Sequence, residues 1–384
     1  MYNKNNLNLK GDNMFKKLLK LLLILLISVI SLALLFVVTL QIFEYRPKEE
    51  TELTIDHNLE NLSSNKINLS NPIKITTFNI GYASLSETED FVMDGGEKGR
   101  MDSKELVEAN LIGIGSIISD SDADIYLLQE VDYKSNRSYN TLQYNYFSDL
   151  VDMPVTLGYN YRCIFVPFPF KVGQMMGSVN SGIMTATNYY VDDATRIQLP
   201  GSFSWPLRLA NLKRCAVITR LPIDGSDKSL IIINVHLSAY DDGTMRVQEL
   251  NALQELMQAE YELGNYVIVG GDFNQTFPNA YTDNGDGTYN YHYELKDPNF
   301  WQAFGLNATW FNSNNWQFAN DITNPTCRLL HQPYDTANTA NNQYYAIDGF
   351  IVGPNVQIES IHTRDENFKY SDHNPVELIV RLNP

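Results

Sequence analysis

One segment of the sequence, residues 21–40, contains twenty consecutive residues without a charge and constrains the chain more than any other feature. It reads LLLILLISVISLALLFVVTL, and residues 41–43 extend it. A helix rises 1.5 Å per residue, so the run would span about 30 Å, the thickness of the hydrocarbon core of a bilayer. A cleaved signal peptide is the alternative, but the run is too long and no A-x-A-like site follows it. The segment therefore predicts a transmembrane anchor over residues 21–43.

The charges that flank the apolar run predict its orientation. Lys16, Lys17 and Lys20 come immediately before it, whereas basic and acidic residues balance just beyond it. Because positive charge stays on the cytoplasmic side, residues 1–20 are expected inside and the rest of the chain outside. The sequence thus predicts a single-pass protein of the cell membrane, attached through its N-terminal helix, with an extracytoplasmic domain.

Composition divides and limits the rest of the chain. Residues 44–70 are polar and predict a linker, and residues 71–384 predict one large domain. The 384-residue chain carries a net charge of −17, which repels polyphosphates and disfavours a broad, sequence-independent nucleic-acid binder. Its three cysteines lack the spacing of a zinc site.

From residue 73 onward, short apolar runs each end at a polar residue, which is typical of strands. Helical spacing covers residues 103–119, where Asp102 or Ser103 can cap the N-terminus, and residues 244–262. The strands are expected at residues 73–78, 125–131, 229–237, 266–274, 346–353 and 373–380. Strands that alternate with helices predict an α/β domain with helices covering the sheets, in which polar side chains at strand ends meet on one rim.

Eight polar residues occupy such strand ends. They are Asn79, Glu130, His236, Asp272, Asn274, Asp348, Asp372 and His373. Each alone is a common turn or capping residue, but together they place several carboxylates on one rim, where they would repel one another unless a divalent cation or an imidazole compensated. Oxygen ligands without cysteine favour Mg²⁺, Mn²⁺ or Ca²⁺ over zinc.

Six motifs in order then carry a resemblance to a known family. They are TTFNI (76–80), LLQEVD (127–132), NVHLSAY (234–240), GGDFNQ (270–275), AIDGFIV (346–352) and SDHNPV (371–376). The sequence resembles the endonuclease/exonuclease/phosphatase superfamily, which includes DNase I-like nucleases. The resemblance covers residues 73–382. It implies a four-layer α/β/β/α sandwich, two mixed sheets flanked by helices, and metal-dependent cleavage of phosphate esters.

The resemblance also implies roles for the eight residues. Glu130 would be the main ligand of Mg²⁺, with Asn79 beside it and Asp372 completing the set. The catalytic residues would be Asp272, which orients and deprotonates the attacking water; Asn274, a hydrogen-bond donor to the phosphate; His373, held by Asp348; and His236, at the leaving oxygen. The sequence departs from the family pattern in two places, since Ala186 replaces the usual Arg and no Glu lies between Val131 and Gln248 as a partner for His236.

A phosphodiesterase that acts outside the membrane is the leading functional hypothesis. Its phosphate-ester substrate would be a lipid headgroup or extracellular DNA, and no stable protein partner is inferred. A phosphomonoesterase remains an alternative because a metal site of this kind does not discriminate. The alternative from another class is a catalytically inactive binding module of the same fold.

Overall fold

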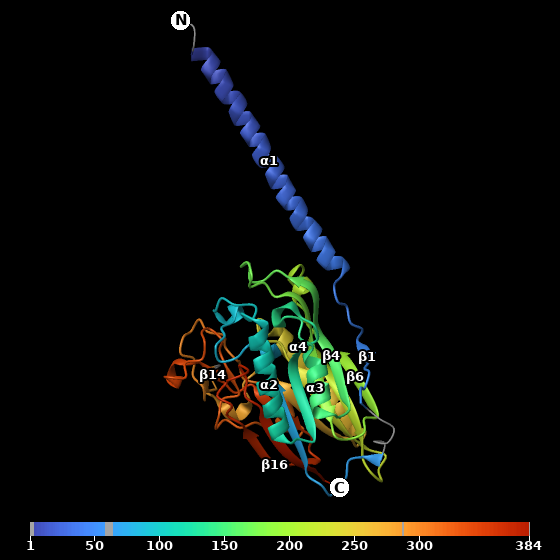
Figure 1. Ribbon diagram of the computed structural model, residues 1–384. Helices are drawn as coiled ribbons and strands as arrows, with labels where there is room; N and C mark the ends of the chain where they lie inside the picture. The colour runs from blue at the N-terminus through green and yellow to red at the C-terminus, as the bar shows by residue number, and fades with distance from the viewer. Residues whose placement is uncertain (1–3, 58–63, 286–287, 384) are drawn as a thin grey trace.

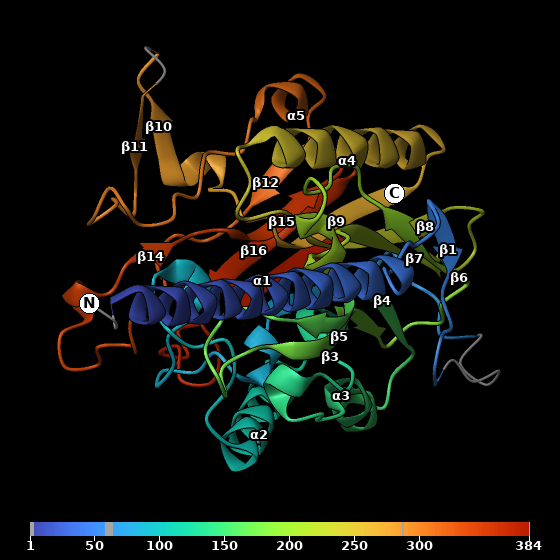
Figure 2. The same ribbon diagram turned by 90° about the horizontal axis from the view of Figure 1, so that it is seen from above.

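The structure is a computed structural model that describes residues 4–57, 64–285 and 288–383. Two β-sheets pack face to face, and helices cover their outer faces (Figure 2). The seven-stranded sheet contains, in spatial order, β1 (Glu50–Glu52), β6 (Asp193–Gln198), β7 (Cys215–Pro222), β8 (Ser229–His236), β9 (Tyr266–Asp272), β15 (Asp348–Val352) and β12 (Gln317–Ala319). The six-stranded sheet contains β16 (Val356–Thr363), β17 (Val376–Leu382), β2 (Ile73–Asn79), β3 (Ile125–Asp132), β5 (Gly177–Thr187) and β4 (Val155–Val166).

Side-chain alternation along the strands creates the layers. In β8, Leu230 and Ile232 face the opposite sheet, whereas Ile231 and Ile233 face the helix side. Successive strand residues point to opposite faces, so a strand buried on both faces is apolar throughout. The strands expected at residues 73–78 and 125–131 show the same continuous burial. The predicted four-layer α/β/β/α sandwich is confirmed.

The outer layers are formed by helices with apolar faces. They are α2 (Lys104–Ser121) and α3 (Gln143–Val151) on the six-stranded sheet, and α4 (Thr244–Glu262) and α5 (Thr309–Ser313) on the seven-stranded sheet. Helix α2 begins as expected, because the Ser103 hydroxyl accepts a hydrogen bond from the Leu106 amide at 3.3 Å. Two small hairpin-like pairs lie outside the sheets: β10 (Tyr281–Asp283) with β11 (Tyr289–Tyr291), and β13 (Cys327–Arg328) with β14 (Tyr344–Tyr345).

A long helix, α1 (Lys4–Ile42), projects from the domain (Figure 1). Residues 14–42 are long and apolar enough to cross a membrane, and none of their most apolar stretch is buried in the protein. The helix also extends over residues 4–20, which precede the apolar run. Its last turns contact the domain, where Leu40 is only 6% exposed.

The segment expected to be a free polar linker, residues 44–70, is in large part a piece of the domain. Strand β1 pairs antiparallel with β6, and Asp56 bridges to Val155. Ile67 is fully buried in the core between the sheets. The expectation of a tether is therefore wrong for Glu50–Glu52, Asp56 and Ile67, and residues 58–63 lie outside the described part of the chain. The sequence pattern missed β1 because a three-residue edge strand with solvated side chains has no apolar periodicity.

Candidate active site

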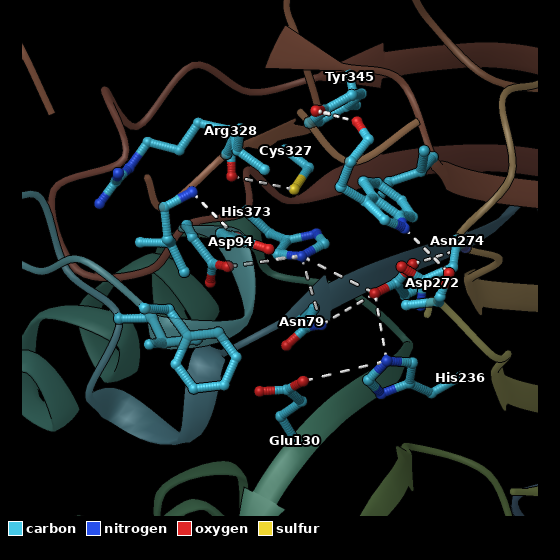
Figure 3. A pocket seen from close by; sticks show the side chains of 18 of the residues that line it. Asn79, Asp94, Glu130, His236, Asp272, Asn274, Cys327, Arg328, Tyr345 and His373 are labelled. Atoms are coloured by element: carbon cyan, nitrogen blue, oxygen red, sulfur yellow. Dashed lines mark hydrogen bonds and ion pairs between the residues drawn. The ribbon is translucent and has the colours of Figure 1, made fainter. Parts of the chain in front are cut away.

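Strand pairing brings three of the predicted residues into one row. His236, at the end of β8, is the register partner of Asp272 at the end of β9. Asp272 in turn is the partner of Asp348 at the start of β15. The three side chains thus sit on adjacent strands at one edge of the seven-stranded sheet. In the facing sheet, Asn79 ends β2 and Glu130 lies two residues before the end of β3, so both sheets deliver polar groups to the same place (Figure 3).

A bulge in β3 directs Glu130 into the site. The pairing of β3 with β5 shifts between Leu128 and Val131, and Glu130 has a φ of +58°. Left-handed backbone at a non-glycine residue is strained and concentrates at functional positions, and a bulge re-aims the side chain that it carries. The Glu130 Oε1 atom lies 4.0 Å from His236 Nε2, whereas Oε2 is buried and has no hydrogen-bond partner in the described part of the chain. A buried carboxylate oxygen without a protein partner offers a ligand atom that suits a cation.

Asp272 is at the centre of the hydrogen-bond network. Its Oδ2 accepts a hydrogen bond from Asn79 Nδ2 at 3.0 Å, and its Oδ1 accepts one from the Asn274 amide at 2.9 Å. His236 Nε2 and His373 Nε2 lie 3.5 and 3.8 Å from Oδ2. Burial, together with the nearby Asp348 carboxylate, raises the pKa of Asp272 to about 7. The two imidazoles therefore face one carboxylate from two sides.

The two histidines have opposite electrostatic environments. His373 Nδ1 lies 2.9 Å from Asp348 Oδ2, so the imidazole donates to the carboxylate. Burial disfavours its charge, but the Asp348 carboxylate outweighs burial and holds the pKa of His373 well above its usual range. Burial, with Arg214 and His373 as nearby cations, holds the pKa of His236 well below its usual range. The surroundings thus favour the protonated form of His373 and the neutral form of His236.

His236 has no carboxylate on its Nδ1 atom. That nitrogen is buried and lacks a partner among the described residues, while Nε2 faces Glu130 and Asp272. This agrees with the missing upstream Glu in the sequence. Arg214 Nη1 donates to the His236 carbonyl at 3.2 Å and fixes the backbone of the residue instead.

Asp372 approaches the site through close contact with a glycine. It is 7% exposed, and burial raises its pKa to about 7. Gly81, just after β2, has a φ of +50°, and a Cβ built on it would lie 2.8 Å from Asp372 Oδ1. Only glycine combines this backbone conformation with this close approach.

Seven of the eight predicted residues line one pocket. The eighth, Asp348, accepts a hydrogen bond from His373, one of the lining residues. The cavity volume is about 90 Å³, well below the several hundred Å³ of sites that enclose a drug-sized ligand. The pocket therefore suits a phosphate group whose substituents remain outside.

Sequence reasoning missed other residues that line the same pocket. They include Asp94, Arg214, Tyr240, Trp301 and Arg328. Tyr240 donates a hydrogen bond to Asp94 at 2.6 Å and closes one wall. Tyr240 lies within the NVHLSAY motif, four residues after His236, so its position was a usable signal. Arg214 follows Lys213 directly before β7. A basic pair before a strand in an acidic chain is a weaker sequence signal than the position of Tyr240.

The donor set fits a hard divalent cation. Asp272, Asp348 and His373 form one group of possible ligands within 4.8 Å of one another, and Cys327, Asp372 and His373 form another among the described residues. Glu130 belongs to neither, but its unpartnered Oε2 faces the same pocket. Burial raises the pKa of Cys327 to about 12, and the other ligand atoms of the two groups are carboxylate oxygens and imidazole nitrogens. Carboxylate and amide oxygens are the ligands of Mg²⁺, Mn²⁺ and Ca²⁺.

A two-sheet sandwich with carboxylates, imidazoles and amides gathered at the strand ends defines a class of metal-dependent phosphoric ester hydrolases. The sequence model of the endonuclease/exonuclease/phosphatase family matches residues 77–373, most of the domain. The chain belongs to this family, whose members are nucleases, phosphodiesterases and phosphatases that require a divalent metal.

Solved structures are similar to the chain in fold. An endonuclease/exonuclease/phosphatase from Beutenbergia cavernae has a TM-score of 0.52 and 16% identity, over 81% of this chain and 72% of that one. One from Bacteroides vulgatus has a TM-score of 0.50 and 16% identity, over 82% of this chain and 100% of that one. A functionally unknown conserved protein from Enterococcus faecalis has a TM-score of 0.51 and 15% identity, over 81% and 100%. No curated protein matches the chain significantly.

Proposed function

We propose that the protein is a divalent-metal-dependent phosphodiesterase that acts at the outer side of a membrane crossed by α1. The observation that carries the proposal is the convergence of seven polar residues, from the ends of five strands, on one narrow pocket. A protein-binding surface does not need buried carboxylates beside one protonated and one neutral imidazole. These groups match the needs of in-line water attack on a phosphate ester.

Glu130, Asn79 and Asp372 are the proposed ligands of Mg²⁺, with Mn²⁺ or Ca²⁺ as substitutes. The bound ion would polarise a phosphoryl oxygen and offset the charge that develops in the transition state. The Glu130 oxygen without a partner supports this assignment. The Asn79 side-chain oxygen accepts a hydrogen bond from the Gly81 backbone amide at 3.0 Å, and its second lone pair would bind the ion.

Asp272 orients the attacking water and accepts its proton. Asn79 and the Asn274 amide hold the carboxylate in place. Asn274 Nδ2 also donates to the Leu237 carbonyl at 2.9 Å, and its second N–H would donate to the phosphate.

The two imidazoles stabilise negative charge on different oxygens of the phosphate ester. His373, paired with Asp348, presents Nε2 as a cationic donor to a non-bridging oxygen. His236 lies on the other side of Asp272 from His373 and interacts with the leaving oxygen. The neutral state of His236 favours a hydrogen bond to that oxygen.

The membrane assignment is supported by how α1 joins the domain. Leu40, in the last turns of α1, is buried in a domain cluster with Tyr161 and Leu209. Removal of the apolar segment as a signal peptide would strip this cluster of a core residue. The lysines before the apolar run favour an N-terminus inside and the domain outside.

Activity of the full-length protein in detergent tests the proposal. With Mg²⁺ or Mn²⁺, we expect hydrolysis of bis-p-nitrophenyl phosphate, abolition by EDTA, and slower hydrolysis of p-nitrophenyl phosphate. Replacement His373→Ala or Asp272→Asn should lower the diester rate by about 100-fold or more. Equal rates for wild type and both variants would refute the assigned roles. Absence of any metal-dependent hydrolysis would favour the inactive binding module, and a faster monoester reaction would favour a phosphomonoesterase.

A further inference from the structure

Two loops expose large apolar side chains to solvent. One lies at the end of β4 and after it, and the other precedes β7. Phe170 and Val172 are 82% and 95% exposed, and Trp205 and Leu207 are 59% and 63% exposed. Ile164 and Phe165 are exposed on the first loop as well. Single exposed apolar residues are ordinary, but six on two adjoining loops form a patch, which is here called the apolar rim.

The two loops of the apolar rim are packed together. Tyr161 donates a hydrogen bond to the Ala210 carbonyl at 2.9 Å, and the Cys163 thiol lies 3.6 Å from the Leu209 carbonyl. Phe168 and Leu209 belong to the same cluster of apolar side chains beneath the rim. The rim therefore has a rigid base, although its outer side chains are uncovered.

The end of α1 is part of the same unit. Phe36 packs edge-on against Phe165, with ring centroids 6.2 Å apart. Trp205 Nε1 donates to Gln41 Oε1 at 3.1 Å. Figure 1 shows α1 leaving the side of the domain on which these green-to-lime loops lie. If α1 crosses a bilayer, its last turns lie at the lipid–water boundary, and the rim is at the same level.

Charge on the two loops differs from that of the chain as a whole. Residues 159–176 and 201–214 contain five basic side chains and no acidic one, in a protein with a net charge of −17. The five are Arg162, Lys171, Arg208, Lys213 and Arg214. Glu44 pairs with two of them and Glu97 with one, so positive charge still exceeds negative charge. Basic and aromatic residues together at a helix end are typical of a surface that faces anionic lipid headgroups.

The rim also borders the active-site pocket. A second hollow, lined by Ser202, Phe203 and Leu212 from the Trp205 loop, shares Arg214 and Tyr240 with the pocket. On the other side, Gly99 packs so closely against Pro169 that a Cβ would lie 2.3 Å from the proline ring. The segment that contains Gly99 follows Phe91, which lines the pocket. Both loops of the apolar rim thus contact segments that contribute residues to the pocket wall.

We propose that the apolar rim inserts into the headgroup region of the bilayer that α1 crosses, and that the pocket takes its phosphodiester from a phospholipid headgroup in that leaflet. The proposal rests on the phosphodiesterase function proposed above. A narrow pocket admits the phosphate alone, and the acyl chains stay in the membrane beside the rim. DNA would have to reach the same pocket beside two loops held against lipid.

Trp205 gives a direct test of insertion that does not depend on activity. The full-length protein is placed in phosphatidylcholine–phosphatidylglycerol vesicles, with and without phosphatidylcholine brominated near the headgroup end of its acyl chains. We expect brominated lipid to quench the Trp205 component of the fluorescence and acrylamide to reach it poorly. A Trp205→Phe variant, which retains the other three tryptophans, should lose the quenched component. Free access of acrylamide to Trp205 in vesicles would overturn the proposal.

Matched variants test the consequence for the substrate. In the same vesicles with Mn²⁺, a Phe170→Ser/Leu207→Ser variant should hydrolyse vesicle phospholipid about tenfold more slowly or worse than wild type. Its hydrolysis of bis-p-nitrophenyl phosphate should be unchanged. Leu263→Ser is the control. Leu263 is as exposed as Leu207, at 63%, but it precedes the start of β9, whereas Asp272 is at the other end of that strand.

The outcomes separate the two proposals. Lack of diester hydrolysis by the wild type would refute the proposed function itself. Diester hydrolysis combined with cleavage of plasmid DNA, but not of vesicle phospholipid, would sink only the lipid proposal. Equal phospholipid hydrolysis by wild type and the rim variant would do the same.

Discussion

At the scale of single residues, the site depends on a few side chains placed at unfavourable positions. Glu130 has left-handed backbone geometry and a buried oxygen without a partner among the described residues. Asp272 and Asp372 are buried deeply enough that their pKa values rise to about 7. Such arrangements weaken the folded state unless a bound group compensates. The compensation expected here is a divalent cation.

Glu130→Gln should separate metal binding from folding. Metal that binds only the folded state stabilises it by about 2.7 kcal/mol at a hundred times its Kd. We expect Mn²⁺ to raise the Tm of the wild type and not that of Glu130→Gln, whose Tm without metal should equal or exceed the wild-type value. Differential scanning calorimetry with and without Mn²⁺ measures both. The exposed Glu255→Gln variant is the control and should keep the full metal response; an unchanged response in Glu130→Gln would remove Glu130 from the ligand set.

Gly81→Ala should damage the site more than the fold. The added Cβ would meet Asp372 Oδ1 at 2.8 Å, and the φ of +50° is unfavourable for alanine. Gly225→Ala is a matched control, because its φ is +69° and no described atom lies within 4 Å of the added Cβ. Both variants should lose about 1 kcal/mol of stability, measured by urea unfolding. Only Gly81→Ala should lower kcat for bis-p-nitrophenyl phosphate, and equal kcat values in the two variants would contradict the role of this contact.

At the scale of elements, the bulged end of β3 is held by a buried ion pair. Asp132, two residues after Glu130, accepts hydrogen bonds from Arg137 Nη2 at 2.9 Å and from the Ser138 hydroxyl at 2.7 Å. The Arg137 guanidinium stacks on the Tyr82 ring, 3.6 Å from its centroid. This cluster ties the loop after β3 to the loop after β2, the two loops that flank the proposed metal site.

Arg137→Ala should therefore be strongly destabilising. It leaves the fully buried Asp132 carboxylate without its counter-charge, which typically costs about 3–5 kcal/mol. The exposed pair Lys104–Glu108 on α2 offers a contrast, because Lys104→Ala should change stability by less than about 1 kcal/mol. Urea unfolding followed by circular dichroism measures both. A loss below about 1 kcal/mol for Arg137→Ala would show that the ion pair contributes little.

The elements that carry the site could be predicted from the sequence because each strand is a short apolar run that ends at a polar residue. His236 and Asp272 end neighbouring strands, so pairing in register brings them together, and packing of the two sheets brings Asn79 to Asp272. The bulge at Glu130 could not be predicted, since no local pattern marks a register shift. Arg214 and Arg328 reach the pocket through loop paths that apolar periodicity does not describe. Strand β1 was missed for the same reason.

At the scale of the whole molecule, charge and apolar surface are unevenly distributed. The chain is strongly acidic, yet the loops around the end of α1 are basic and apolar. An acidic body is repelled by anionic lipid, whereas the basic loops are attracted, so the domain has a preferred face toward the bilayer. This preference and the anchor act in the same direction.

The side of the membrane on which the domain lies can be tested with one introduced cysteine. The three native cysteines are free and buried, so they should give little background. Ser226→Cys places a thiol on the exposed turn between β7 and β8. We expect a membrane-impermeant maleimide to label this variant in intact cells as fully as in permeabilised ones. Labelling only after permeabilisation would place the domain inside and refute the orientation.

Strand β1 has a consequence for proteolytic separation of the domain from α1. A protease that cut between residues 43 and 49 would free a domain that still carries β1 on the edge of β6. A cut after Glu52 would bare the backbone amides and carbonyls of β6, and such open edges recruit other chains. A shed enzyme would therefore stay monodisperse only when the cleavage falls N-terminal to Glu50.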